Sequence, residues 1–233
     1  MESSPKQGNL NINYSRMKIK ACLFDLDGVV VDTARYHYLA WKKIADDLGF
    51  SFSEHQNERL KGVSRMESLD ILLEIGNIQV DQRTKEELAT TKNNLYVSYI
   101  QKMTPDEILP GVIRFLDELR NNGILIALGS ASKNALSILD KINIAQKFDA
   151  VIDGNKVSKA KPDPEVFIKG STELGIDPQN CLVFEDAQAG IDAARNGGMH
   201  IIGIGQSENL KNAEYVIPGF EKMDMDQLRS WYL

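Results

Sequence analysis

KACLFDLDGVVVDT, residues 20–33, carries an apolar run directly into two aspartates, Asp25 and Asp27. The apolar run is typical of a strand that is buried on both faces of a parallel sheet. At the end of a strand, residues i and i+2 point to the same side, so both carboxylates can face one ligand. Two unit charges ~4 Å apart repel by about 4 kcal/mol at an effective dielectric constant of about 20. The pair therefore indicates a site that either keeps one carboxylate protonated or recruits a cation.

Two structural alternatives to a catalytic pair are a calcium-binding loop and a helix cap. An EF-hand loop that began at Asp25 would need glycine at its sixth position and glutamate at its twelfth. Val30 and Tyr36 occupy those positions, which excludes such a loop. Helix capping explains a single aspartate but not a pair at the end of an apolar strand. The sequence therefore favours a catalytic pair.

Strand and helix patterns alternate along most of the chain. Apolar stretches predict strands over 19–25, 124–130, 148–153, 181–186, 200–205 and 213–217. Helical periodicity predicts helices over 33–48, 53–60, 65–75, 82–103, 111–122, 133–141 and 187–196, and a further helix that opens at Asp163-Pro164. Asp32 or Thr33 is the expected N-cap of the first helix.

This order predicts an α/β protein with a Rossmann-like open parallel sheet core and an inserted all-helical cap domain. The core is expected to comprise residues 17–32 and 104–233. The cap is expected over residues 33–103, where no strand pattern interrupts the helices. Residues 1–16 lack periodicity and are interpreted as a loose N-terminal extension.

The composition restricts the partners that the protein can have. The net charge of −6 argues against a nucleic acid held by general electrostatics. No stretch approaches the apolar length that a membrane helix requires, and no secretory signal pattern follows the first methionine. The two cysteines, Cys22 and Cys181, fall in predicted buried strands, which favours a cytoplasmic protein. An acidic surface and a dedicated cap favour a monomer.

Several polar residues end the predicted strands and should meet at one edge of the sheet. Asp25, Glu185 and Asp186 would form an oxygen-rich site of the kind that suits Mg²⁺, although a Glu-Asp pair before a helix is also typical of an acidic cap. Ser130 ends a strand and can donate to a phosphoryl oxygen beside a helix N-terminus. Two further polar residues, Ser132 and Lys161, also have ordinary structural interpretations. Ser132 can be a helix N-cap, and Lys161 can be a solvated surface lysine.

These stretches, in this order, resemble the four motifs of the haloacid dehalogenase superfamily of phosphotransferases, over nearly the whole chain from Lys18 onward. The resemblance implies that Asp25 is the nucleophile and forms an aspartyl phosphate, and that Asp27 is the general acid/base. Ser130 and Lys161 would hold the transferring phosphoryl group. The implied metal ligands are Asp25, Asp27 through its backbone carbonyl, Glu185 and Asp186.

Within that superfamily the strings at 32–41, 60–69, 91–100 and 129–134 are similar to those of the β-phosphoglucomutases. That group interconverts β-D-glucose 1-phosphate and glucose 6-phosphate through β-glucose 1,6-bisphosphate. The implied ligands of the non-reacting phosphate are Arg65, Ser132, Lys133 and Asn134. Thr33 and His37 would lie at the cap hinge, and Lys92 would face the sugar.

Two other functions share most of these residues. A phosphatase for a small sugar or related phosphate ester would use the same core, so only the cap residues favour a mutase. A catalytically silent scaffold is the second alternative, but such a protein has no chemical reason to keep a crowded carboxylate cluster. One departure from related sequences is Ala187, which follows the acidic pair where a hydroxyl residue is common and so removes one hydrogen-bond donor near the metal site.

Overall fold

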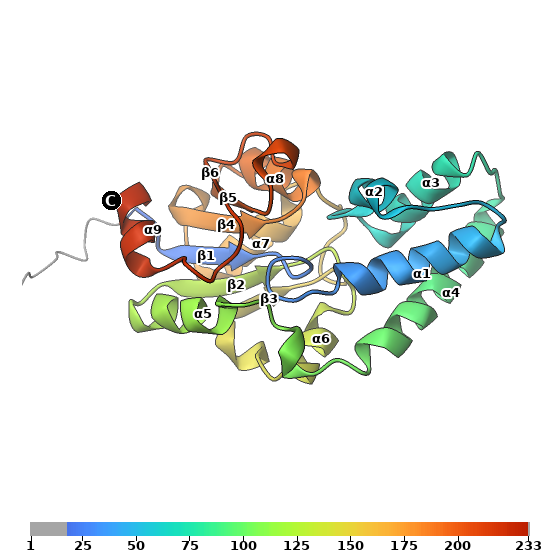
Figure 1. Cartoon of the computed structure of the whole chain (residues 1–233). Helices are drawn as coiled ribbons and strands as arrows, with labels where there is room; N and C mark the ends of the chain where they lie inside the picture. Colours follow the sequence, from blue (N-terminus) through green and yellow to red (C-terminus); the bar gives the residue numbers. More distant parts are fainter. Residues whose placement is uncertain (1–17, 233) are drawn as a thin grey trace, which may run out of the picture.

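The computed structural model describes residues 18–232, and the order of its elements follows the predicted one (Figure 1). The extension expected over residues 1–16 lies outside the described residues. Six parallel strands form one sheet in the order β3-β2-β1-β4-β5-β6. The strands are β1 (Ala21–Phe24), β2 (Leu125–Gly129), β3 (Ala150–Ile152), β4 (Cys181–Glu185), β5 (His200–Ile204) and β6 (Tyr215–Ile217). The predicted open parallel sheet is confirmed.

Alternate residues of the central strand pack on opposite faces of the sheet. Cys22 and Phe24 contact one apolar cluster, whereas Ala21 and Leu23 contact another. The first face is covered by α5 (Val112–Asn121), α6 (Ala135–Lys141) and α9 (Met225–Tyr232), and the second by α7 (Glu165–Leu174) and α8 (Gln188–Asn196). Because helices cover both faces, the strands are apolar throughout rather than alternating with polar residues.

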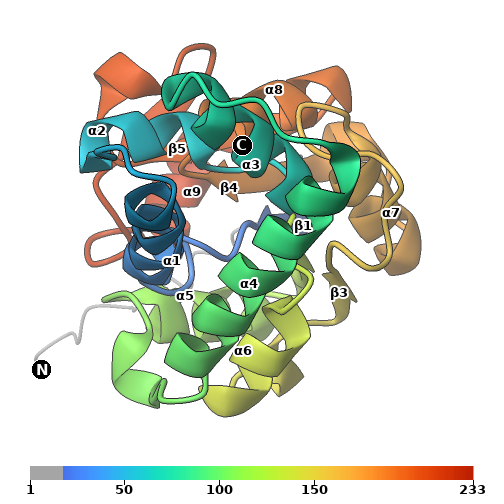
Figure 2. The same ribbon diagram turned by 90° about the vertical axis from the view of Figure 1, so that its right-hand side faces the viewer.

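The segment between β1 and α5 is helical and has an apolar core of its own. Its helices are α1 (Ala34–Asp47), α2 (Glu54–Asn57), α3 (Arg65–Ile75) and α4 (Gln82–Ile100). Trp41, Ile44 and Leu72 are among the residues of its core. Figure 1 shows these helices beyond the carboxyl ends of the strands, and Figure 2, which faces them, shows them in front of the sheet. These four helices, which are called the cap below, therefore lie over the edge where ligands bind in such sheets.

Some predicted boundaries were wrong. The helix expected over 82–103 ends at Ile100, and the one expected over 133–141 begins at Ala135. Thr33 is the N-cap residue of α1, as expected, although its hydroxyl donates to Asp27 and makes no cap hydrogen bond. Helix α9 was not predicted. None of the helices within residues 18–232 is long and apolar enough to cross a membrane.

Candidate active site

The pairing of β1 with β4 brings the two acidic motifs together. Phe24 pairs with Phe184, and the backbone N–H of Asp25 donates to the carbonyl of Phe184 at 3.0 Å. Carboxylate oxygens of Asp25, Glu185 and Asp186 lie within 4.8 Å of one another. The pairing of the two strands therefore brings Asp25 together with the adjacent acids Glu185 and Asp186 from a distant part of the chain.

Two glycines make room for this carboxylate cluster. A Cβ added at Gly28 would lie 2.3 Å from Oδ2 of Asp186, and one added at Gly190 would lie 1.9 Å from Oε2 of Glu185. Gly28 also has a φ of 81°, in the left-handed region that favours glycine. Each glycine lets backbone approach a carboxylate more closely than any other residue would permit.

Lys161 is the buried cation of the cluster. Its side chain is 1% exposed, and its ammonium donates to Asp25 at 2.5 Å and to Glu185 at 2.8 Å. Burial opposes the charge of Lys161, but the two carboxylates raise its pKa above the usual value. The interpretation of Lys161 as a solvated lysine is therefore wrong.

The remaining charge of the cluster favours a cation. Burial and the charge of Asp25 raise the pKa of Glu185 to about 8 and that of Asp186 to about 7. The acids are crowded and poorly solvated, and a divalent cation there would stabilise their ionised forms. The donor set of carboxylate oxygens, together with the glycine cradles, fits a hard cation such as Mg²⁺.

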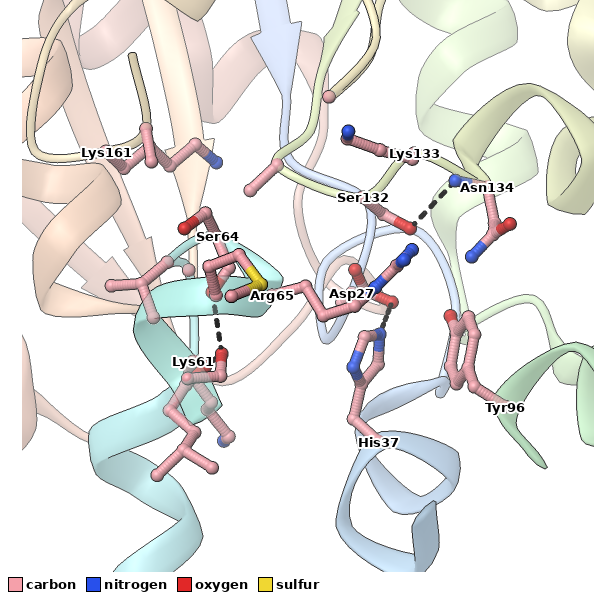
Figure 3. Close-up of a pocket in the computed structure, with 18 of the residues that line it drawn as sticks. Asp27, His37, Lys61, Ser64, Arg65, Tyr96, Ser132, Lys133, Asn134 and Lys161 are labelled. Carbon is pink, nitrogen blue, oxygen red and sulfur yellow. Dashed lines mark hydrogen bonds and ion pairs between the residues drawn. The ribbon is translucent and has the colours of Figure 1, made fainter. Parts of the chain in front are cut away.

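The side chain of Asp27 contacts residues at the start of the cap. Its carboxylate accepts a hydrogen bond from Thr33, and Nε2 of His37 lies 3.6 Å from its Oδ1 (Figure 3). On the other side of the ring, the Lys92 ammonium lies 2.9 Å from Nδ1 of His37. Because an ammonium can only donate, Nδ1 accepts and Nε2 carries the proton that faces Asp27. Burial and the charge of Asp25 raise the pKa of Asp27 to about 6, a value suited to proton transfer near neutral pH.

Basic groups without carboxylate partners face the cavity from the cap. Ser64 caps α3 by accepting from the N–H of Glu67, which places Arg65 at the first helical position. Within residues 18–232 no hydrogen bond or ion pair engages the Arg65 guanidinium. Lys92 is 2% exposed and lies over the rings of Trp41 and Tyr96, at 4.7 and 4.8 Å. Among residues 18–232 neither Arg65 nor Lys92 forms an ion pair with a carboxylate, so both are suited to an anionic ligand.

The loop after β2 supplies the facing wall. The Ser130 hydroxyl accepts from the N–H of Ser132, and the Ser132 hydroxyl accepts from the N–H of Asn134. The N–H groups of Ser132 and Asn134 are therefore used inside the loop, and α6 is a short helix of Ala135–Lys141. The anion site expected beside Ser130 at this helix N-terminus stays a prediction. Ser132 is not the N-cap of α6, which is Asn134.

All these walls enclose one cavity of about 450 Å³ between cap and core. Of the predicted site residues, ten line it: Asp25, Asp27, His37, Arg65, Lys92, Ser132, Lys133, Asn134, Lys161 and Asp186. Thr33, Ser130 and Glu185 lie behind the lining and are buried. The acidic motifs and the hydroxyl-bearing loop thus converge on one cavity, as the sequence predicts.

Some residues of the cavity were not predicted. Lys61 lies 3.7 Å from Asp186 and links the cap to the acidic cluster. Asn93 on α4 accepts a hydrogen bond from Asn134 at 3.2 Å, across the same junction. Both residues belong to segments that resemble the β-phosphoglucomutases: Lys61 lies in 60–69 and Asn93 in 91–100. Their position in these segments is the feature of the sequence that could have identified them. Ala187 lacks the hydroxyl that is common at this position, but its backbone N–H donates to Oε1 of Glu185. This carboxylate oxygen therefore has a hydrogen-bond donor without the hydroxyl.

We expect Gly28→Ala to weaken metal binding, whereas Gly49→Ala should not. Both glycines have left-handed φ angles, of 81° and 84°, so each substitution should lower the free energy of unfolding by about 1–2 kcal/mol. Only the new methyl at residue 28 meets a carboxylate, because nothing lies within 4 Å of a Cβ at Gly49. Calorimetric titration with Mg²⁺ measures the difference, and equal affinities in the two variants would contradict it.

Comparisons with known proteins agree with this geometry. A family model described as haloacid dehalogenase-like hydrolase matches residues 19–198. The β-phosphoglucomutase of Bacillus subtilis (strain 168) is 43% identical over 201 residues, which cover 85% of this chain and 89% of the relative. The crystal structure of β-phosphoglucomutase from Clostridium difficile superposes with a TM-score of 0.87 at 44% identity, covering 92% of this chain and 97% of that one. A phosphorylated carbohydrates phosphatase of Thermotoga maritima is 30% identical over 197 residues, covering 82% of this chain and 88% of the relative.

Proposed function

The chain belongs to the haloacid dehalogenase-like hydrolase family, and we propose that it is a phosphohexomutase that interconverts β-D-glucose 1-phosphate and glucose 6-phosphate. The observation that carries this proposal is that Asp25 and Lys161 of the core and Arg65 of the cap line one cavity. We infer that this cavity has two anion-binding ends, one at Asp25 and Lys161 and the other at Arg65, with Lys92 facing the sugar. A substrate with two phosphates, such as β-glucose 1,6-bisphosphate, uses both ends.

In the proposed reaction, an Asp25 oxygen attacks phosphorus and the sugar oxygen leaves, which gives an aspartyl phosphate. Lys161 lies against Asp25 and would stabilise the charge on the transferring group, together with the hydroxyl of Ser130. Asp27, whose pKa is about 6, would protonate the leaving sugar oxygen and take the proton back from the attacking hydroxyl in the second transfer. Covalent capture divides one difficult step into two easier ones.

A divalent cation, proposed to be Mg²⁺, would be held by Asp25, Glu185, Asp186 and the backbone carbonyl of Asp27. When bound it would offset the negative charge shared by the phosphoryl group and the carboxylates. The distances within the carboxylate cluster support three of these ligands.

The second end of the cavity would hold the phosphate that is not reacting. Arg65, Lys133 and Asn134, which line the cavity from both sides of the cap–core junction, would bind it, together with Ser132 (Figure 3). We propose residues 33–103 as the unit that opens to let the bisphosphate turn over and closes to exclude water from the phosphoenzyme. Thr33 and His37, which contact Asp27 from the hinge, would couple closure to the position of the acid.

The main alternative is a phosphatase of the same family. It would share the Asp25 end of the cavity, and the Thermotoga relative carries such a name. Supplying β-glucose 1-phosphate, Mg²⁺ and a trace of the 1,6-bisphosphate separates the two functions. We expect glucose 6-phosphate to form with little inorganic phosphate; release of phosphate as the main product would identify a phosphatase. Free buried cysteines suit a cytoplasmic enzyme, which we propose acts as a monomer.

We expect Arg65→Ala to slow isomerisation by about 10²-fold or more, as when one positioned charge is removed from a transition state. Hydrolysis of a simple aryl phosphate should change little, because that substrate has no second phosphate. Arg59→Ala, which alters an exposed arginine of the same cap, is the matched control. Equal losses in the two reactions of Arg65→Ala would contradict the assigned role.

The affinity for glucose 6-phosphate should fall as the pH rises above about 7. Burial and the charge of Arg65 lower the pKa of Lys92 to about 7, so free enzyme loses this charge above that pH. A bound phosphate favours the ammonium, so binding at higher pH must take up a proton and weakens by up to about tenfold per pH unit. Calorimetry between pH 6.5 and 9 measures the slope. Lys92→Met should flatten it, and an unchanged slope in this variant would assign the proton to another group.

A further inference from the structure

A second cavity, of about 620 Å³, lies beside the first at the cap hinge. Both chain segments that join cap and core line it, through Asp32 in one and Leu109 and Pro110 in the other. Its other walls include Glu58 at the end of α2 and the loops that follow β5 and β6. The cavity is therefore separate from the space that the sugar phosphate would fill.

The two cavities share a wall at the acidic cluster. Ala34, Lys61 and Asp186 line both of them. Gly28, which supports the Asp186 carboxylate, lines only the second cavity. One of the proposed metal ligands is thus reached from either side.

The charges of the two linings differ in sign. Among the described residues, the second cavity is lined by one base, Lys61, against four acids: Asp32, Glu58, Asp186 and Glu221. Basic side chains outnumber acidic ones around the first cavity. The local field should therefore draw cations into the second cavity and repel phosphates from it.

We propose that the second cavity is the passage by which a hydrated divalent cation reaches and leaves the carboxylate cluster while a sugar phosphate fills the first. Lys61 stands at the shared wall, with its ammonium 3.0 Å from Glu58 and 3.7 Å from Asp186. An arriving cation displaces this ammonium from Asp186, and Glu58 retains it. This proposal rests on the proposed function, because it requires a metal ion bound at the carboxylate cluster.

The first test needs no variant. Mn²⁺ bound to the enzyme is displaced by excess Mg²⁺, and its release is followed by electron paramagnetic resonance with and without saturating glucose 6-phosphate. Release should keep its rate when the sugar phosphate fills the first cavity. Release that stops on adding glucose 6-phosphate would place the passage in the first cavity and overturn the proposal.

The second test narrows the passage. Nothing lies within 4 Å of a Cβ at Gly219, which lines the second cavity, so Gly219→Trp can place an indole there, with Gly219→Ser as the small control. In the sugar phosphate complex, association and dissociation of Mn²⁺ should both slow by about tenfold, equivalent to about 1.4 kcal/mol of barrier, with an unchanged Kd. Wild-type rates in the tryptophan variant would overturn the passage. Failure of the wild-type enzyme to bind Mn²⁺ would instead contradict the proposed metal site.

Discussion

Asp25→Asn is expected to lower kcat for isomerisation by about 10⁴-fold or more, the loss seen when a catalytic nucleophile is removed. The amide is a poor nucleophile and cannot form the aspartyl phosphate on which both transfers depend. The substitution is nearly isosteric, so the backbone bond between Asp25 and Phe184 should persist. Stopped assays of glucose 6-phosphate formation measure the loss.

The control for this variant is Asp47→Asn, which alters an exposed aspartate of α1. It should retain wild-type kcat. Asp25→Asn should still bind glucose 6-phosphate, because the Arg65 end of the cavity is untouched. Substantial isomerisation by Asp25→Asn, at even a tenth of the wild-type kcat, would show that another group accepts the phosphoryl.

Lys161→Met should damage both stability and catalysis. It leaves Asp25 and Glu185 buried without their shared cation, and breaking a buried ion pair in this way costs about 3–5 kcal/mol of unfolding free energy. Loss of one preorganised donor at the transferring group should lower kcat by about 10²–10³-fold. Denaturant unfolding and single-turnover assays measure the two effects.

Lys169→Met is the matched control, because Lys169 pairs with Glu165 but is exposed at the surface. Its loss should cost less than about 1 kcal/mol. A similarly small cost for Lys161→Met would mean that the buried carboxylates are protonated or solvated when the lysine is absent. Unchanged kcat would remove Lys161 from the proposed mechanism.

The fold and the acidic cluster could be predicted from the sequence because both follow from local patterns. Apolar runs such as residues 21–24 identify buried parallel strands, and alternation with helices fixes their direction. Parallel direction then places the residue after each strand at the same edge. The sequence alone therefore predicts that Asp25 and Glu185 lie close together.

Other features depend on packing that local patterns do not carry. Lys161 follows a polar stretch and precedes a proline, which is also the pattern of a surface turn; its burial comes from partners 136 and 24 residues away. The contact of Lys61 with Asp186 requires the cap to lie on the core. Thr33 was expected as a possible helix N-cap, but its hydroxyl donates a hydrogen bond to the nearby carboxylate of Asp27.

The central claim, that Asp25 carries the phosphoryl group between the two sugar positions, is tested most directly by trapping that species. Enzyme is mixed with Mg²⁺ and β-glucose 1,6-bisphosphate labelled in its phosphates, quenched in acid within milliseconds, digested and analysed by mass spectrometry. The account predicts label on the peptide that contains Asp25, formed fast enough to support turnover and discharged by added glucose 6-phosphate. Label on any other residue, or isomerisation without labelled protein, would contradict it.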